Sequence, residues 1–377
     1  MIKGQFSLNE IVHLTSVHTY EDTRIFYKEL HTLRQAGFFV VLIAPAIENQ
    51  VVADIKIIGI KKQKNRFLRM TLTAWQIYRL AIKEKADIYH FHDPELIWIG
   101  LLLKIKGYKV IYDSHENVSQ QILSKEWLPK STRKIVSYVF AVLEMMVSRY
   151  FDYIIAATPS IKKHFVKLGI NKCVDVNNYP VLKESNIGGD AAAKIKNQIC
   201  YVGGISKVRG IKQMILAIEL LNDVRLVLAG DFTELELKKE CSKLFGWGRV
   251  NELGFIDRNK TMKIMQSSIA GLVLFQPAPN HIEAQPNKLF EYMAAGIPVI
   301  ASDFPLWRSI IVNNHCGICV NPFDVKGIAG AIKYIIDHPK DAEIMGDNGR
   351  RLVIEKFNWD NEAKKLIDVY KEVSACK

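Results

Sequence analysis

Two glutamates with seven residues between them enclose the segment of this sequence best suited to chemistry. Glu283 lies in a polar loop after an apolar run, and Glu291 follows Pro286 in a stretch typical of a helix that begins at this proline. The exposed amides of such a helix start can hold a pyrophosphate, and here they belong to Asn287, Lys288 and Leu289. The carboxylates can accept hydrogen bonds from ribose and sugar hydroxyls. A salt-bridged surface helix would explain Glu291 alone, but not the whole segment.

A glycine-rich loop is the second candidate for phosphate binding. Gly203 and Gly204 follow a predicted strand, and Arg209 with Gly210 opens a predicted helix. Glycines let the backbone approach a ligand closely, and Arg209 would add a charge-assisted contact to a diphosphate. A plain tight turn would account for the glycines by themselves.

The pattern Glu283, seven residues, Glu291, then Gly296-Ile-Pro298-Val resembles the signature of the family 4 retaining glycosyltransferases. The first half of the chain adds patterns similar to those of bacterial members that assemble polysaccharides and O-antigens. These patterns are His18-Thr-Tyr-Glu-Asp22-Thr-Arg24, Tyr89-His90-Phe-His92-Asp93 and Ile111-Tyr112-Asp113-Ser-His115-Glu116. The resemblance implies the GT-B fold, in which two Rossmann-like α/β domains with parallel sheets face a central cleft.

The resemblance also implies roles for single residues. Glu291 would bind the ribose of a nucleotide, Glu283 would contact the donor sugar, and the amides after Pro286 would hold the diphosphate. The implied reaction retains the anomeric configuration, and the leaving phosphate itself takes the acceptor proton. Preorganised amides and cations would stabilise the charge that grows on the diphosphate. UDP is favoured over GDP as the nucleotide of the donor.

One departure from the family pattern concerns the cations. The family often has Gly-Arg at the strand end where this chain has Gly203-Gly204, so that one of two expected cations is missing. Arg209 remains as the first cation, in the place of a family lysine. Lys207 or Lys288 could compensate for the second.

The first half of the chain holds seven of the ten histidines. His115 follows a predicted strand end, where a histidine of the resembled family contacts the donor sugar. Acceptor or phosphate binding is predicted in the first strand-to-helix loop and near a later strand end, at His18, Asp22, Arg24 and His92. His90 and His92 alternate along one strand and point the same way, which favours a buried hydrogen-bonding role for His90.

Metal binding is the alternative use of these side chains. His90, His92 and Asp93 could be pictured as ligands, but no convincing Asp-x-Asp accompanies them, and Asp93 could instead cap the next helix. Cys316 and Cys319 form the only C-x-x-C pair, whereas a structural zinc site needs about four ligands. We therefore expect small buried cysteines near a strand, a metal-independent transfer and no cofactor besides the nucleotide sugar.

The order of apolar runs predicts the elements that must position these residues. Strand-like and helical patterns alternate from Ile11 to Tyr153 and again from Gln198 to Ser302, which is typical of parallel sheets covered by helices. A polar, Gly- and Pro-containing stretch at 177–190 separates the two series and predicts a hinge. We expect an acceptor-binding domain at 1–178, a nucleotide-sugar-binding domain at 179–355 and a final helix at 356–377 that could cross back to the first domain.

The charge of the chain is uneven. The net charge is +12, and residues 1–178 carry 25 Lys and Arg against 16 Asp and Glu. This basic half predicts an acidic partner, and basic runs with apolar neighbours at 61–69 and 125–134 favour an anionic membrane surface. A solvated surface explains these runs equally well. No run reaches the roughly 18 apolar residues of a membrane span. We expect a cytoplasmic protein, peripheral on the inner face of the plasma membrane, that uses a lipid-linked glycan acceptor.

Three other functions compete with glycosyl transfer. A nucleotide-sugar epimerase of the same layout would form its product without an acceptor. A phosphorylase of similar fold would need a lysine-bound pyridoxal phosphate. A nucleic-acid-binding protein would use the basic half, but no helix-turn-helix or zinc-finger pattern is present in the sequence.

Overall fold

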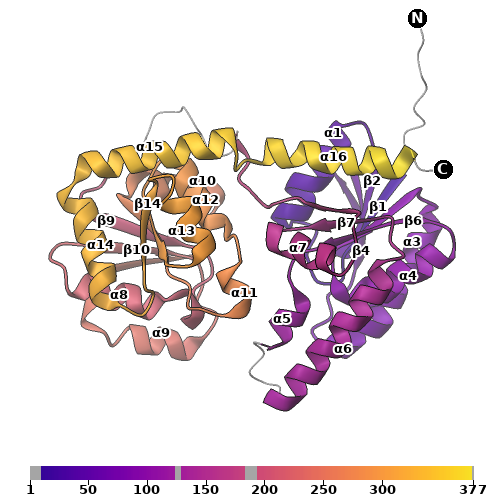
Figure 1. The fold of residues 1–377 in the computed structure, drawn as a ribbon, viewed down its shortest axis with the longest axis horizontal. Coiled ribbons are helices and arrows are strands. Elements are labelled where there is room, and N and C mark those ends of the chain that lie inside the picture. The colour runs from indigo at the N-terminus through magenta and orange to yellow at the C-terminus, as the bar shows by residue number, and fades with distance from the viewer. Residues whose placement is uncertain (1–9, 124–128, 183–192, 376–377) are drawn as a thin grey trace, which may run out of the picture. The chain divides into compact units, whose positions relative to one another are not determined.

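The computed structural model describes residues 10–123, 129–182 and 193–375 of the 377-residue chain. The chain divides into two compact units (Figure 1): Met1–Asn178 with Asp360–Lys377, and Tyr179–Trp359. The predicted basic stretch around Lys125 and Trp127, and the end of the predicted hinge at Asp190, lie outside the described residues.

The first unit is built on an eight-stranded sheet with the order β3-β4-β2-β1-β5-β6-β7-β8. All neighbouring strands are parallel except β3 and β4, which form an antiparallel pair that the sequence patterns did not predict. The strands are β1 (Glu10–Leu14), β2 (Phe39–Pro45), β3 (Gln50–Val52), β4 (Ile55–Ile60), β5 (Ile88–Phe91), β6 (Lys109–Ser114), β7 (Tyr153–Ala156) and β8 (Cys173–Asp175).

The two faces of this sheet differ in polarity. Val12 and Leu14 of β1 belong to an apolar core with residues of α3 and α4, whereas the intervening His13 lies on the opposite face and contacts Tyr370 of α16. The helical segments of the unit are η1 (Thr23–Leu30, with wide turns), α1 (His31–Gln35), α2 (Arg66–Leu68), η2 (Arg69–Thr73), α3 (Ala74–Glu84), η3 (Pro94–Leu96), α4 (Ile97–Ile105), α5 (Val118–Leu123), α6 (Lys130–Ser148), α7 (Pro159–Lys167) and α16 (Trp359–Ala375).

The second unit contains a six-stranded, fully parallel sheet with the order β11-β10-β9-β12-β13-β14. Its strands are β9 (Gln198–Val202), β10 (Arg225–Ala229), β11 (Val250–Gly254), β12 (Ala270–Val273), β13 (Val299–Ser302) and β14 (Gly317–Val320). Its helical segments are η5 (Lys207–Arg209), α8 (Ile211–Glu219), α9 (Leu235–Cys241), η6 (Phe245–Arg249), α10 (Arg258–Ser267), α11 (Pro279–Ile282), α12 (Asn287–Ala294), α13 (Pro305–Ile311), α14 (Val325–Asp337) and α15 (Pro339–Glu355). Two apolar clusters, one on each face, make the core. The predicted fold class, two α/β domains with parallel sheets, is thus confirmed.

The last helix, α16, packs on the first unit, although almost the whole second unit precedes it in the chain. Tyr370 is fully buried there, and Glu362 accepts a hydrogen bond from the Asn177 amide at 2.8 Å. Leu366 and Val369 are buried as well. The first unit is therefore completed by residues from the far end of the sequence.

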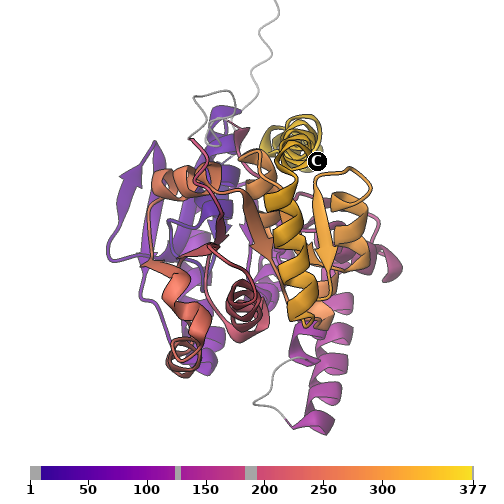
Figure 2. The same ribbon diagram turned by 90° about the vertical axis from the view of Figure 1, so that its left-hand side faces the viewer.

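Helix α6 presents polar side chains inward and apolar side chains outward. Ser137 and Glu144 are buried, and Glu144 accepts a hydrogen bond from the Tyr112 hydroxyl at 3.1 Å. The exposed face carries Ile135, Tyr138, Val139, Leu143 and Met146. The N-terminal half of α6 extends beyond the rest of its unit in Figure 1 and in Figure 2. Among the described residues, no helix is long and apolar enough to cross a membrane.

Gly210 allows the glycine loop to pack closely against the segment that follows β12 in the six-stranded sheet. Its φ is +72°, and a Cβ placed on it would stand 2.2 Å from the Leu274 carbonyl oxygen. Gly254 has a similar φ of +65°, but there the nearest atom to an added Cβ is an Asp231 oxygen at 3.7 Å. The two positions share the backbone conformation and differ in the available space.

We predict that Gly254→Ala costs about 1–2 kcal/mol of unfolding free energy, the price of a left-handed residue with a side chain. Gly210→Ala should cost about 1–3 kcal/mol more, because the new methyl group also overlaps the Leu274 carbonyl. Urea unfolding followed by tryptophan fluorescence measures both values. Equal losses in the two variants would contradict the role assigned to this close approach.

Candidate functional site

The glycine loop of the second unit brings two cations to one point. A Cβ on Gly203 would lie 2.7 Å from Lys288 Nζ and 3.7 Å from an Arg209 guanidinium nitrogen. Gly203 has a φ of +113°, so both its conformation and its surroundings require glycine. The sequence predicted both cations as site residues, and the fold brings them together at the end of β9.

Two aromatic rings support these cations. Arg209 and Lys288 lie 5.4 Å and 5.6 Å from the centre of the Phe275 ring, and Lys288 lies 4.3 Å from that of Tyr201. Lys288 Nζ also donates a hydrogen bond to the Tyr201 hydroxyl at 3.0 Å. Lys207, the other candidate for the missing cation, is exposed on η5.

The electrostatic state of Lys288 follows from this crowding. Burial disfavours its charged form, and the neighbouring Arg209 adds repulsion, so that together they lower the pKa of Lys288 to about 7 despite an opposing contribution from Glu291. Two positively charged side chains that both lie beside Gly203 raise the free energy of the empty site. A bound polyanion would relieve that repulsion.

The segment between the two glutamates starts a helix, as predicted. Helix α12 begins at Asn287 after Pro286, and the Leu289 amide already donates to the Pro286 carbonyl at 3.0 Å. The amides of Asn287 and Lys288 precede the Leu289 amide, the first one that donates within the helix, and are therefore the ones suited to a ligand. Leu289, which was also predicted to bind through its amide, is less well placed for this role.

The two glutamates differ in their surroundings. Glu283 is exposed at the end of α11, and Glu291 is half-buried one turn inside α12. Hydrogen bonds hold the loop between them, because Trp307 Nε1 donates to the Ala284 carbonyl at 2.7 Å and the Tyr179 hydroxyl donates to Gln285 at 2.8 Å. The two residues that follow Glu283 are thus fixed on their own unit.

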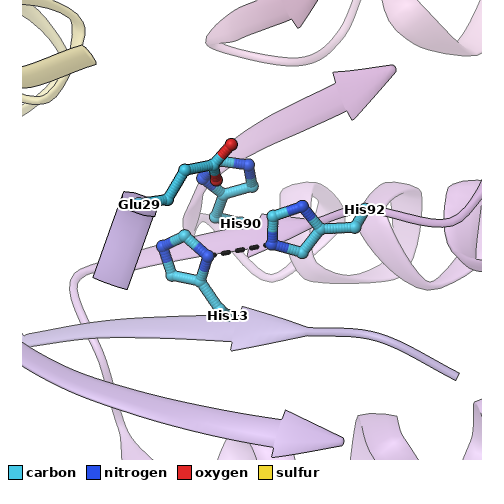
Figure 3. A group of neighbouring side chains, drawn as sticks. All are labelled: His13, Glu29, His90 and His92. Carbon is cyan, nitrogen blue, oxygen red and sulfur yellow. Dashed lines mark hydrogen bonds between the residues drawn. The ribbon is translucent and has the colours of Figure 1, made fainter. Parts of the chain in front are cut away.

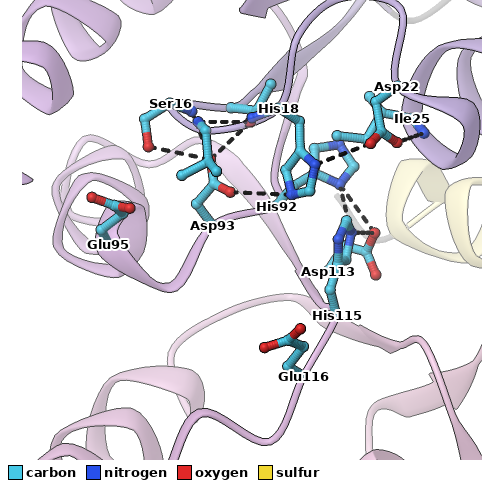
Figure 4. A network of polar contacts seen from close by, with 12 residues as sticks. Ser16, His18, Asp22, Ile25, His92, Asp93, Glu95, Asp113, His115 and Glu116 are labelled. Atoms are coloured by element: carbon cyan, nitrogen blue, oxygen red, sulfur yellow. Dashed lines mark hydrogen bonds and ion pairs between the residues drawn. The ribbon is translucent and has the colours of Figure 1, made fainter. Parts of the chain in front are cut away.

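The first unit gathers its predicted polar residues at the carboxyl ends of β1, β5 and β6 (Figure 4). His115 Nε2 and His92 Nδ1 donate to the same Asp113 oxygen at 2.7 Å and 3.0 Å. His18 Nδ1 bonds to Asp22 at 3.0 Å, and its other ring nitrogen lies 3.6 Å from Asp93. Of these, His18, Asp22 and His115 retain solvent exposure, at 31%, 26% and 19% of their side chains.

Arg24 and His92, both predicted to bind the acceptor, do not reach the surface. Arg24 is buried and donates twice to Asp113, at 2.9 Å and 3.1 Å, and once to the Val176 carbonyl at 2.7 Å. His92 is buried as well, with its Nε2 bonded to His13 at 2.9 Å. Because their polar atoms are already used inside the unit, they support the site rather than contact an acceptor.

Asp113 is the centre of this network. Burial alone would raise its pKa, but the Arg24 guanidinium and the His115 ring hold the pKa of this carboxyl well below its usual range. The buried Glu29 has the opposite shift, because burial and the nearby Asp113 charge raise its pKa well above the usual value. Asp113 is therefore ionised and fixes the orientation of His115, whose second ring nitrogen remains for a ligand.

Two other predictions for this region have clear outcomes. Asp93 does not cap η3; it accepts hydrogen bonds from the Ser16 amide at 2.6 Å and from the Thr15 hydroxyl at 2.8 Å. The hydrogen-bonding role of His90 is confirmed, since its Nδ1 contacts the Tyr370 hydroxyl at 2.5 Å.

Sequence reasoning missed three members of the network, His13, Glu29 and Tyr370. A histidine in the otherwise apolar run Ile11-Val-His-Leu14 was a usable signal, because an isolated polar residue in a buried strand needs a partner. Tyr370 gave no comparable signal, since its partners lie more than 250 residues away.

Two family models of glycosyltransferases match successive parts of the chain. The family model for glycosyl transferases group 1 matches residues 183–352, and the model for glycosyltransferase family 4 matches residues 23–177. The MMP α-(1→4)-mannosyltransferase of Mycolicibacterium hassiacum is 21% identical over 313 residues, which cover 79% of this chain and 75% of the relative.

Two solved structures extend over nearly the whole chain. Sucrose-phosphate synthase from Thermosynechococcus elongatus has a TM-score of 0.78 at 18% identity and covers 98% of this chain and 100% of its own. The Anabaena protein HepE in complex with UDP and glucose has a TM-score of 0.73 at 14% identity, with coverage of 97% and 100%. At these identities the likeness concerns the fold.

Proposed function

The chain belongs to the GT4-type glycosyltransferases with the GT-B fold, and we propose that it transfers a glycosyl group from a UDP-sugar to a hydroxyl of a glycan acceptor, with retention of configuration. The observation that carries this proposal is the convergence of Arg209 and Lys288 on Gly203. The polysaccharide-assembly patterns of the first half support a lipid-linked glycan as the acceptor.

The donor site is assembled from the second unit. Arg209, Lys288 and the first amides of α12 bind the diphosphate, and Gly203 and Gly204 leave the backbone accessible to it. Glu291 accepts hydrogen bonds from the ribose, and Glu283 contacts the donor sugar. The choice of UDP is supported by the fold neighbour HepE, whose structure contains UDP and glucose.

Charge development on the leaving group explains why two cations are needed. As the bond between the sugar C1 and the diphosphate oxygen breaks, negative charge grows on the diphosphate. Arg209 and Lys288 stabilise that charge more strongly in the transition state than in the ground state, which lowers the barrier. They supply positive charge that a divalent ion provides in other transferases, so the proposed transfer is metal-independent. The leaving phosphate takes the proton of the acceptor hydroxyl.

The first unit supplies the acceptor-binding residues and one contact to the donor sugar. His18 and Asp22 form a partly exposed, hydrogen-bonded pair suited to sugar hydroxyls. His115 is held by Asp113 through its Nε2, and we assign its remaining nitrogen to a hydroxyl of the donor sugar. Arg24 and His92 stabilise this arrangement from beneath.

Helix α6 supports a membrane-bound acceptor. Its outward face is apolar, the basic Lys134 on the helix and Arg149 directly after it are exposed, and Glu144 is buried. An apolar face flanked by basic side chains fits the surface of an anionic bilayer. We place the enzyme on the inner face of the plasma membrane, where a lipid-linked glycan would be accessible.

The ribose assignment is tested with UDP binding. UDP should raise the melting temperature of the wild type by mass action, and Glu291→Ala should abolish that shift. Glu283→Ala is the matched control, because it should keep the UDP shift and lose sugar transfer. A Glu291→Ala protein with the full shift would refute the assignment. Formation of a new epimer from UDP-hexoses without an acceptor would instead favour an epimerase.

The Lys288 assignment predicts a pH dependence. The diphosphate binds the ammonium form, which dominates in the free protein below the Lys288 pKa of about 7 and declines above it. The affinity for UDP should therefore fall between about pH 7 and pH 9, by up to about tenfold per pH unit. Titration calorimetry should show weaker binding and a flatter profile for Lys288→Met. Lys207→Met, an exposed control on η5, should keep the wild-type slope; loss of the slope there would assign the second cation to Lys207.

Membrane contact through α6 is tested by vesicle sedimentation. Replacing Ile135, Val139 and Met146 together by serine should weaken binding to phosphatidylglycerol vesicles at least about tenfold, because less apolar surface is buried in the bilayer. Phe255→Ser with Ile344→Ser, exposed apolar residues of the second unit, should leave binding unchanged. Equal binding of wild type and triple variant, or equal binding to neutral vesicles, would contradict the proposal.

A further inference from the structure

A second cluster of potential ligand atoms lies beneath the acceptor residues of the first unit. His13, Glu29, His90 and His92 are all buried, and one ligand atom from each lies within 4.8 Å of the others. Figure 3 shows the three rings and the carboxylate turned toward one another. The residues come from β1, η1 and the end of β5, and β5 lies far from the other two segments in the sequence.

Each of the three rings makes a hydrogen bond through the nitrogen that is not a potential ligand atom of the cluster, here called its outer nitrogen. His13 Nε2 and His90 Nδ1 both contact the Tyr370 hydroxyl, at 2.9 Å and 2.5 Å, and His92 Nδ1 donates to Asp113 at 3.0 Å. Such outer contacts fix the tautomer and the orientation of metal-binding histidines. The second nitrogens, His13 Nδ1, His90 Nε2 and His92 Nε2, are left as ligand atoms.

Two buried groups of the cluster, the His90 ring and the Glu29 carboxyl, have atoms without a hydrogen-bond partner among the described residues. His90 Nε2 is one of these atoms, and an Asp113 oxygen lies 4.0 Å from it. Both Glu29 oxygens are the others, although Oε1 lies 3.0 Å from Arg24 Nε in an ion pair. Lone pairs buried without a hydrogen bond are costly, so these two groups point to a missing cation.

From these contacts we infer that His13, His90, His92 and Glu29 bind a divalent transition-metal ion, with zinc as the best match. Three imidazoles and a carboxylate are typical zinc ligands, and four of them complete a tetrahedral shell. The 2.9 Å between His13 Nδ1 and His92 Nε2 would open by a few tenths of an ångström, since ligand atoms about 2.0–2.1 Å from zinc lie farther apart. Without the ion, a proton lies between His13 Nδ1 and His92 Nε2. The ion takes the place of that proton.

The role of this ion is structural. With four protein ligands it has no open position for a substrate, and it is separate from the proposed transfer, which needs no metal. Arg24, already paired with Asp113, orients Glu29 from outside the shell. Through Tyr370 the cluster also holds α16, so the ion would join β1, β5, η1 and the last helix.

The neighbouring group His92, Asp113 and His115 is the less suitable location. Asp113 has both oxygens engaged: one by Arg24, and the other by Arg24 and both histidines. Its charge is thus neutralised by a guanidinium, and no lone pair there lacks a donor.

Metal analysis of the tag-free full-length protein tests the inference. Protein from zinc-supplemented medium should contain about one equivalent of zinc by plasma mass spectrometry, and cobalt-loaded protein should show the visible absorption of tetrahedral Co²⁺. The melting temperature should fall when the protein is refolded with a chelator. Protein without zinc or a cobalt spectrum, and with a chelator-insensitive melting temperature, would overturn the inference.

Three variants locate the ion. His90→Gln and the nearly isosteric Glu29→Gln should lower the zinc content below about one tenth of an equivalent and remove the chelator effect. His115→Gln, outside the four-residue cluster, should retain the zinc. The opposite pattern, with zinc lost only in His115→Gln, would overturn the assignment. If a variant fails to fold by circular dichroism, the wild-type stoichiometry and the cobalt spectrum still decide the question.

Discussion

The buried ion pair between Arg24 and Asp113 is the constraint on which the first unit depends. Removing a guanidinium and a carboxylate from water is costly unless hydrogen bonds replace the lost water contacts, and here each of the three Arg24 nitrogens donates one and both Asp113 oxygens accept. The pair joins η1 to β6 and to the Val176 carbonyl beyond β8. It also sets the charge that orients His92 and His115. Of the partly exposed polar residues, His115 is therefore held directly by this buried ion pair.

The second unit uses the opposite arrangement, in which like charges are brought together without full compensation. Arg209 and Lys288 meet above Gly203, and the aromatic rings of Tyr201 and Phe275 offset only part of their repulsion. Preorganised charge of this kind raises the free energy of the empty protein and lowers that of the complex with a polyanion. The ionic contacts of the first unit thus make it rigid, whereas the cations of the second unit are available to bind a ligand.

The sequence predicted the parallel α/β architecture and the helix start at Asn287 because both depend on local patterns, apolar periodicity and a proline at the first turn. It also predicted Arg209, but it left Lys207 and Lys288 as alternatives for the second cation, and the fold brings Lys288 to Gly203. The burial of Arg24 and His92 depends on η1, β6 and α16 packing together, which no local pattern encodes. Strand β4 was predicted, but β3 and its antiparallel pairing with β4 were missed, because the three residues of β3 are too few to show a periodicity.

The placement of α16 has a consequence for how the chain folds during synthesis. A ribosome makes residues 1–178 first, yet Tyr370, the hydroxyl partner of His13 and His90, is translated only after the whole second unit. Residues 1–178 are therefore synthesised before α16 can cover the sheet face that carries His13 and His90. Until then its imidazoles are accessible to water, to chaperones and to any ion in the surrounding solution, so a helix translated after the second unit completes the structure of the first.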